Sequence, residues 1–204
     1  MTDASFWDKA AKKYAKDPIN DMAAYAETRD RMREVLQPHH RVLELGCGTG
    51  STALELADRV ERYIGTDVSP KMIEIAQSKQ SGATPAQLSF AVYDVASLPP
   101  GSRDVILALN VLHLLPDLEE VLNQIFKMLP SGGLLIAKTA LLKDGAWFVP
   151  WIIPVMRAIG KAPYVRVLTG AELLFMQRNV GFNVTETLTQ DGIAPRMFTI
   201  ARKP

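Results

Sequence analysis

The sequence predicts an α/β fold in which helices cover both faces of a mostly parallel sheet. Three observations support this prediction. An apolar run at 41–45 ends at a glycine-rich turn, and a helix-like pattern follows it directly. Strand-like segments then alternate with helical ones as far as residue 180. Two strand-like segments close the chain with the turn-forming pair Asp191-Gly192 between them, which predicts a final antiparallel hairpin.

The stretch RVLELGCGTG, residues 41–50, is the strongest local signal. Gly46, Gly48 and Gly50 are spaced by two, and without a Cβ atom each lets the backbone come close to a ligand. The dinucleotide fingerprint is G-x-G-x-x-G, whereas this pattern is G-x-G-x-G with Glu44 before it. A carboxylate there is a poor neighbour for a pyrophosphate, but it suits a ligand that carries an ammonium group.

The motif ELGCGTG resembles motif I of the class I S-adenosylmethionine (SAM) dependent methyltransferases. The resemblance implies a Rossmann-like, doubly wound seven-stranded sheet, mostly parallel with a C-terminal antiparallel hairpin strand, and SAM bound at the carboxyl edge. Glu44 would lie near the ammonium group of SAM. The residues whose backbone would face its methionine part are Gly46, Cys47, Gly48 and Gly50. A nucleotide-dependent oxidoreductase remains an alternative.

Composition limits the classes of function. The 204 residues fit one domain over 1–204, with 48% apolar and 22% charged residues. A net charge of +1 argues against a nucleic-acid partner, whose binding domains are normally basic. The single cysteine excludes a disulfide framework and a cysteine zinc cluster, and it fits a cytoplasmic protein. Charges near the start argue against a signal peptide, and no apolar stretch reaches the ~20 residues of a spanning helix.

Residues 1–36 are predicted to form an N-terminal helical arm of two helices, broken at Asp17 and Pro18. In the families that this sequence resembles, an aromatic arm folds over the SAM pocket. The resemblance therefore implies that Tyr14 is a lid on the cofactor, while a plain packing role stays open. His39 and His40 lie in a polar turn with no third ligand nearby, so no metal site is predicted.

Strand 63–67 ends at Asp67, about 20 residues after the glycine turn, where an acidic residue accepts hydrogen bonds from ribose hydroxyls in nucleoside-binding folds. Ser69 as N-cap and Pro70 as first helical residue already start the next helix, so Asp67 is not needed there. Val68 is assigned to the same site. Met72, in the first turn of helix 70–79, either covers the adenine or packs in the core.

Strand 88–95 ends in YDV. The resemblance implies that Asp94 accepts a hydrogen bond from the adenine amino group and that Val95 offers its backbone amide. A strand-end turn aspartate is the alternative interpretation of Asp94.

Strand 104–109 leads into NVLHLLPDL, which is similar to the S-N-x-L-H-H-x-P segment of the small-molecule group that includes ubiquinone- and menaquinone-biosynthesis methyltransferases. Asn110 and His113 match, whereas Leu114 replaces the second histidine. Asn110 would lie at the edge where the reacting sulfonium is expected. His113 is the candidate catalytic base, with a pKa near the operating pH, or else it packs beside the pocket.

Two capping boxes are predicted farther along the chain. One pairs Asp117 with Glu120 at the start of a helix that runs to Leu129, and the other pairs Thr169 with Glu172 at the start of helix 169–179. The remaining predicted strands are 134–140, 183–189 and 197–202.

Residues 141–168 form an apolar insert with interspersed basic residues, and Pro150, Pro154 and Pro163 are expected to break it into short pieces. In the fold that this sequence resembles, the insert after the fifth strand lies over the substrate side, so an apolar insert implies an apolar acceptor beneath a lid. It could instead make peripheral contact with a membrane through 147–159, or form a simple cap.

The sequence therefore predicts a SAM-dependent methyltransferase that acts on a small hydrophobic acceptor: a quinone, phenol, lipid amine, thiol or carboxylate. Catalysis would rest on alignment, since the cofactor itself carries the electrophilic methyl group. The alternative is a non-catalytic SAM-binding or membrane-surface-docking protein with the same fold.

Overall fold

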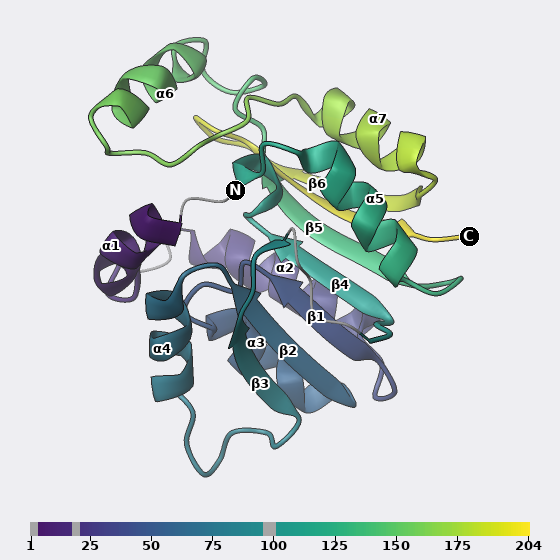
Figure 1. The fold of residues 1–204 in the computed structure, drawn as a ribbon. Coiled ribbons are helices and arrows are strands. Elements are labelled where there is room, and N and C mark those ends of the chain that lie inside the picture. Colours follow the sequence, from purple (N-terminus) through teal and green to yellow (C-terminus); the bar gives the residue numbers. More distant parts are fainter. Residues whose placement is uncertain (1–3, 18–20, 96–100) are drawn as a thin grey trace.

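The computed structural model describes residues 4–17, 21–95 and 101–204, so Pro18 of the predicted break lies outside the described part. A single seven-stranded sheet runs through the molecule in the order β3-β2-β1-β4-β5-β7-β6 (Figure 1). The parallel strands are β1 (Arg41–Leu45), β2 (Arg62–Asp67), β3 (Leu88–Val92), β4 (Val105–Leu109) and β5 (Leu134–Ala140). The antiparallel pair is β6 (Asn183–Gln190) and β7 (Arg196–Arg202). The predicted fold class is confirmed.

Helices cover both faces of this sheet. The helices α2 (Met22–Val35), α3 (Ser51–Leu56) and α4 (Pro70–Ser78) pack on one face, and α5 (Leu118–Met128) and α7 (Gly170–Val180) pack on the other. Because side chains alternate along a strand, Leu43 and Leu45 enter the second layer while Val42 enters the first. Burial on both faces explains why the strands read as continuous apolar runs.

The strand order reverses at β1, which pairs with β2 on one side and with β4 on the other. In open α/β sheets ligands bind outside the carboxyl ends of the strands at such a switch point. The glycine turn follows β1 at this edge, so the topology itself marks the candidate site.

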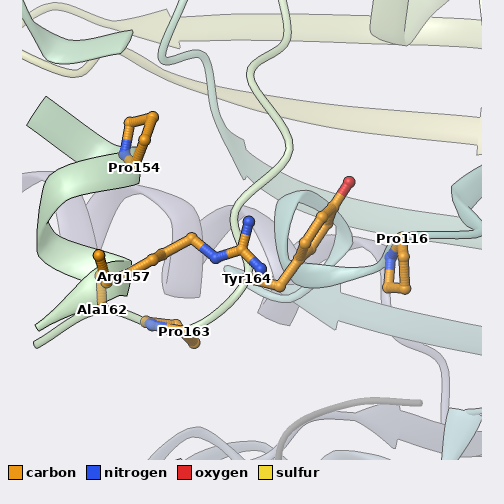
Figure 2. Close-up of a pocket in the computed structure, with 7 residues that line it drawn as sticks. Pro116, Pro154, Arg157, Ala162, Pro163 and Tyr164 are labelled. Atoms are coloured by element: carbon orange, nitrogen blue, oxygen red, sulfur yellow. The ribbon is translucent and has the colours of Figure 1, made fainter. Parts of the chain in front are cut away.

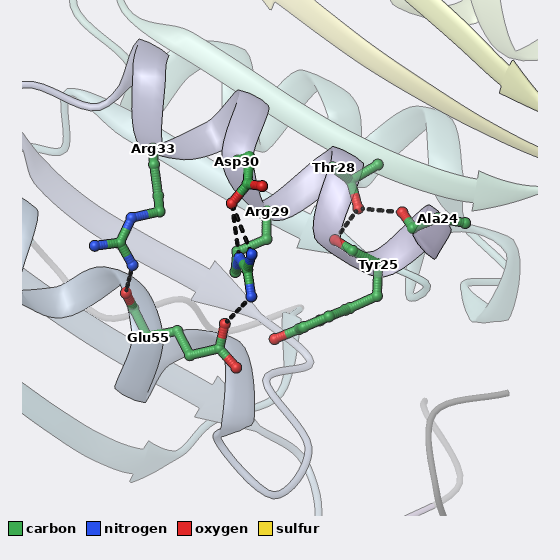
Figure 3. A network of polar contacts seen from close by, with 7 residues as sticks. All are labelled: Ala24, Tyr25, Thr28, Arg29, Asp30, Arg33 and Glu55. Carbon is green, nitrogen blue, oxygen red and sulfur yellow. Dashed lines mark hydrogen bonds and ion pairs between the residues drawn. The ribbon is translucent and has the colours of Figure 1, made fainter. Parts of the chain in front are cut away.

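The helical arm is attached to the helix that follows the glycine turn (Figure 3). Arg33 Nη1 donates to the carbonyl oxygen of Glu55 at 2.8 Å, and Arg29 Nη1 lies 3.4 Å from Glu55 Oε2. On the same helix, Thr28 Oγ1 donates to the carbonyl oxygens of Ala24 and Tyr25, both at 3.0 Å. The contacts of Arg33 and Arg29 with Glu55 link α2 to α3.

The predicted capping boxes have different outcomes. The box of Thr169 and Glu172 is present, which confirms the second prediction. The first is wrong, because the Asp117 side chain makes no capping hydrogen bond at the start of α5. Asp117 has φ −103° and ψ 48°, not the extended conformation from which an N-cap side chain reaches the first amides.

The insert also differs from its prediction. Helix α6 (Val149–Ala158) includes both Pro150 and Pro154. Pro150 lies in the first turn of the helix, where no backbone N–H is needed. Pro154 removes one hydrogen bond inside the helix, but the helix continues beyond it, and its last bond runs from Ile159 N to Val155 O. Strand β3 ends at Val92, three residues earlier than expected, so Asp94 and Val95 follow the strand. Within the described ranges, no helix combines the length and apolar character needed to cross a membrane.

Candidate functional site

The three glycines of the turn all have left-handed backbone conformations, with φ of 63°, 54° and 75°. A Cβ atom on Gly46 would lie 2.7 Å from Cγ2 of Val111, and one on Gly50 would lie 2.6 Å from Cζ of Phe90. Both distances are shorter than real contacts, so these two glycines are needed for close packing of the turn against its neighbours.

Gly48 differs from Gly46 and Gly50, because a Cβ atom at Gly48 would have room. Apart from the two neighbouring residues of the chain, the only described atom within 4 Å of a Cβ atom at Gly48 would be Tyr14 Cε1, at 3.6 Å. Tyr14 is 55% exposed and ends the arm helix α1 (Ala4–Tyr14). The backbone at Gly48 is therefore open to a ligand, and Tyr14 stands where a lid would stand, although its lid role stays a prediction.

An interaction that the sequence did not reveal holds α1 in this place. Asp8 Oδ1 accepts hydrogen bonds from Ser69 Oγ at 2.6 Å and from the backbone N–H of Lys71 at 3.1 Å. The hydroxyl of Ser69, which also caps α4, lowers the pKa of Asp8. In Figure 1 the two helices α1 and α4 lie side by side at the carboxyl edge.

Asp67 is held by two different segments. Its Oδ2 accepts from the backbone N–H of Gly48 at 3.0 Å, and its Oδ1 accepts from the N–H of Ser69 at 2.9 Å. Burial raises the pKa of Asp67, and the backbone bonds oppose that shift. Each carboxylate oxygen keeps a second lone pair, so Asp67 fits the predicted acceptor for two ribose hydroxyls.

Glu44 is 2% exposed and receives a hydrogen bond from the hydroxyl of Tyr63, at 2.9 Å. Burial raises the pKa of Glu44 to about 7; the Tyr63 bond opposes the shift and the charge of Asp67 adds to it. A cation beside this carboxyl group would favour its charged form. The sequence analysis missed Tyr63, and the usable signal was a phenol in a buried strand, which needs a partner for its hydroxyl.

Lys79, which the sequence analysis also missed, donates hydrogen bonds to the glycine turn. Lys79 Nζ donates to the carbonyl oxygen of Thr49 at 2.8 Å and to Thr49 Oγ1 at 2.9 Å, and it reaches Ser51 Oγ at 3.2 Å. Cys47 contributes both backbone and side chain to the turn, and its Sγ donates to the carbonyl oxygen of Gly48 at 3.7 Å. Its thiol is buried in the core, which raises the thiol pKa, and its N–H donates to Thr66 O at 2.9 Å.

A backbone hydrogen bond brings the residues predicted to contact adenine close to the end of β2. The N–H of Tyr93 donates to the carbonyl oxygen of Asp67 at 3.0 Å, which places Asp94, partly exposed, beside the end of β2. Val95 and Met72 are buried, and Val68 is partly buried. The cofactor roles of these four residues remain predictions.

Asn110 follows β4 at the same edge. Its φ of 58° is the one positive value for a non-glycine residue in the described ranges, and its N–H donates to Lys138 O at 2.7 Å. Its side chain is exposed. A left-handed non-glycine residue is uncommon, and such conformations cluster at functional sites.

His113 lies in the short 3-10 helix Leu112–Leu114. Its Nδ1 is buried and finds no hydrogen-bond partner among the residues that the structure describes. Burial, with a smaller contribution from Arg196, lowers its pKa to about 4. The expected pKa near the operating pH is therefore wrong, because the buried site disfavours the charged imidazolium. The catalytic role of His113 stays a prediction.

Two cationic residues on β5 and β7 were not anticipated. Lys138 is buried, with Nζ 3.3 Å from Ala24 O and 3.4 Å from Thr28 Oγ1; burial and Arg196 lower its pKa. Arg196 pairs in register with Ala140, two residues beyond Lys138, so both cations project from one face of the sheet. A lysine within the apolar run LLIAKTA was the available signal.

The insert borders a recess of about 620 Å³ (Figure 2). Arg157 extends from α6, and its guanidinium carbon lies 5.0 Å from the centroid of the Tyr164 ring. The insert is also tied to the candidate site, because Arg166 N donates to His113 O at 2.7 Å and Arg166 Nη1 donates to Pro116 O at 2.9 Å. The lining residues are Pro116, Pro154, Arg157, Ala158, Ala162, Pro163 and Tyr164.

Comparison with known proteins agrees with this geometry. A family model described as a methyltransferase domain matches residues 43–135. The chain is 32% identical over 165 residues to a ubiquinone biosynthesis O-methyltransferase of Chromobacterium violaceum, covering 76% of this chain and 69% of that one. It is 33% identical over 132 residues to the magnesium-protoporphyrin O-methyltransferase of Rhodobacter capsulatus, covering 59% of each.

Another match, 41% identical over 116 residues, is to squalestatin hexaketide synthase of a Phoma species, of whose length the chain spans only 4%. Among solved structures, magnesium protoporphyrin IX methyltransferase from Synechocystis PCC 6803 with bound S-adenosylhomocysteine (SAH) gives a TM-score of 0.74 at 20% identity. That similarity covers 99% of this chain and 95% of the other, and it shows a shared fold.

Proposed function

This chain belongs to the SAM-dependent methyltransferases, and from that premise we propose that it methylates a small hydrophobic acceptor. SAM supplies an electrophilic methyl group on a sulfonium centre. The residues of the protein must therefore bind the cofactor, orient the acceptor in line with the S–CH₃ bond and exclude water. A cytoplasmic location is part of the proposal and is consistent with the buried, free thiol of Cys47.

The cofactor side is supported by three features of the carboxyl edge. The backbone of Gly48 is open to a ligand, and the oxygens of Asp67 keep lone pairs for ribose hydroxyls. Glu44, with its pKa raised to about 7, gains a favourable partner when an ammonium group lies beside it. These residues fit a nucleoside that carries an amino acid.

The proposed place of the acceptor depends on one observation, the hydrogen bond that Arg166 N donates to His113 O. It holds the end of the apolar insert against the segment that follows β4, beside Asn110. The adjoining recess is lined by three prolines, two alanines and one tyrosine, with one guanidinium, a composition that suits an apolar ring compound bearing a polar group.

An oxygen nucleophile is favoured by two of the relatives, which are both O-methyltransferases. A neutral His113 is a weak base at neutral pH, so the residues of the site act chiefly by alignment. Alignment of reacting groups can lower a barrier by ~7–11 kcal/mol.

The test is release of SAH from SAM with two acceptor pools side by side. One is a detergent-dispersed extract of lipids and quinones, and the other is a soluble mixture of thiols, phenols and small acids. We expect turnover with the first pool and an O-methylated product by mass spectrometry. Turnover with the second pool alone would contradict a quinone or lipid acceptor and would make the insert a cap over a small apolar pocket. SAM binding with no turnover in either pool would favour the non-catalytic alternative.

A further inference from the structure

The two most exposed large apolar side chains of the described residues, Trp147 and Trp151, lie just before α6 and on it, and two further exposed ones follow at Val155 and Ile159. Trp147 is 82% exposed, Trp151 74%, Val155 61% and Ile159 60%. These four residues are spaced by four: Trp151 and Val155 lie in α6 and share one of its faces, while Trp147 and Ile159 flank the helix. We call them the α6 stripe.

Helix α6 packs only lightly on the protein, with Val149, Pro150 and Ile153 partly covered. None of its ten residues, all of which the structure describes, is buried. In Figure 1 the helix stands apart from the sheet, above α1 and to the left of α7. Exposed apolar patches of this kind mark interaction surfaces, because covering them removes unfavourable contact with water.

The charge of the segment indicates what covers the stripe. Residues 145–171 contain no Asp or Glu, and they contain Arg157, Lys161 and Arg166. Arg157 and Lys161 lie at the end of α6 and just beyond it, near the stripe in sequence. Cations beside exposed tryptophans match an anionic lipid surface, where tryptophan prefers the boundary between hydrocarbon and water.

The dimensions favour a helix that lies on a membrane. Ten residues span about 15 Å, half the thickness of a hydrocarbon core. A short helix with exposed apolar residues, here also Ile152 and Met156, and with adjacent basic residues lies in the plane of the interface. We propose that the α6 stripe docks this protein on the surface of an anionic phospholipid bilayer.

The docking surface goes beyond the proposed function, because it requires neither SAM nor an acceptor. The recess lined by Arg157 and Tyr164 adjoins the same helix (Figure 2). A docked α6 would place this recess close to the membrane surface.

The test is vesicle flotation of the whole protein, with vesicles of phosphatidylcholine alone and of phosphatidylcholine mixed with phosphatidylglycerol. We expect the wild type to float with the anionic vesicles and to be released by salt. Trp151→Glu should lower the bound fraction at least about tenfold, and Lys161→Glu should weaken binding to anionic vesicles.

Phe175→Glu is the matched control, because Phe175 is 69% exposed on α7, outside the stripe. It should float like the wild type. SAH binding by calorimetry, unchanged in Trp151→Glu, would show that this variant is folded and would separate docking from cofactor binding.

A second readout is a shift of tryptophan emission to shorter wavelength when anionic vesicles are added to a Trp7→Phe protein, in which only Trp147 and Trp151 remain. The proposal is overturned if the wild type does not float, or if Phe175→Glu loses as much binding as Trp151→Glu. It is also overturned if sedimentation shows a dimer that Trp151→Glu dissociates while vesicles bind neither protein, since the stripe would then cover a second copy.

Discussion

The hydroxyl of Tyr63 donates to Oε2 of Glu44 at 2.9 Å, and both side chains are buried beneath the glycine turn. The two residues come from neighbouring strands, β1 and β2. Burial disfavours the charge of Glu44, whereas the Tyr63 bond favours it, and the pKa of Glu44 is raised to about 7. A carboxyl group poised in this way responds to pH, to its donor and to a bound cation.

Glu44 should make the protein less stable as pH rises through neutrality. The folded protein keeps a proton on Glu44 between the ordinary pKa of 4.5 and about 7, whereas the unfolded chain loses it. The contribution to the free energy of unfolding is present below pH 4.5 and is lost as pH rises to about 7, by roughly 3 kcal/mol. Urea unfolding of the wild type and Glu44→Gln at about pH 5 and about pH 8 measures it. A constant difference between the two proteins would show that Glu44 titrates normally.

Tyr63→Phe should destabilise the protein and raise the pKa of Glu44 further. The substitution keeps the ring but leaves the buried carboxyl group without its donor, at a cost of ~1–3 kcal/mol. The loss should be larger in alkaline solution, where Glu44 must carry its charge. Tyr93→Phe, at a surface-exposed tyrosine, is the control and should change the unfolding free energy little. Equal losses of unfolding free energy for the two substitutions would show that the hydrogen bond from Tyr63 to Glu44 does not stabilise the protein.

Asp67→Asn should weaken SAH binding in calorimetry. The amide retains an acceptor oxygen for one backbone N–H, so the turn is perturbed less than by alanine. It loses the charge that strengthens bonds to ribose hydroxyls, worth ~1.5–3 kcal/mol, or about 10- to 150-fold in affinity. Asp117→Asn, at a carboxylate that caps nothing, should bind normally. Unchanged affinity of Asp67→Asn would reject the ribose assignment.

Gly50→Ala should be far more damaging than Gly160→Ala. Both glycines have a positive φ, 75° and 69°, so both variants carry the left-handed strain of about 1–2 kcal/mol. A Cβ atom on Gly50 would also lie 2.6 Å from Phe90 Cζ, whereas nothing lies within 4 Å at Gly160. Urea unfolding should show an additional loss of ~1–3 kcal/mol for Gly50→Ala. Adding Phe90→Leu to Gly50→Ala should recover part of this additional loss. Equal losses for Gly50→Ala and Gly160→Ala would show that the Cβ atom at residue 50 does not clash with Phe90.

His113 should titrate near pH 4 when its ring proton is followed by NMR, with His113→Asn used for assignment. Because its folded pKa is below 6.5, its contribution to stability is present above pH 6.5 and is lost as pH falls to about 4. Arg196→Gln should raise the midpoint by removing a nearby positive charge, whereas Arg202→Gln should not. A midpoint near 6.5 in the wild type would restore His113 as a base suited to neutral pH.

Local pattern was sufficient for most of the fold. The run 41–50 predicts a strand, a turn and a helix start, and the structure places all three there. Ser69 caps α4, and Thr169 forms its box with Glu172, because an N-cap bond joins residues three apart. The position of Asp67 followed from the end of a strand, since the carboxyl ends of parallel strands meet at one edge.

Only the tertiary structure decided the electrostatics of the site. The hydroxyl that holds Glu44, the lysine that clamps Thr49 and the arginine that acts on His113 come from elements distant in sequence. A pKa depends on burial and on charges within a few ångströms, and neither quantity has a local sequence signature. The sequence by itself determined which residues reach the carboxyl edge, because periodicity and turn chemistry act over a few residues. Their protonation and their partners were decided when the sheet brought distant segments together.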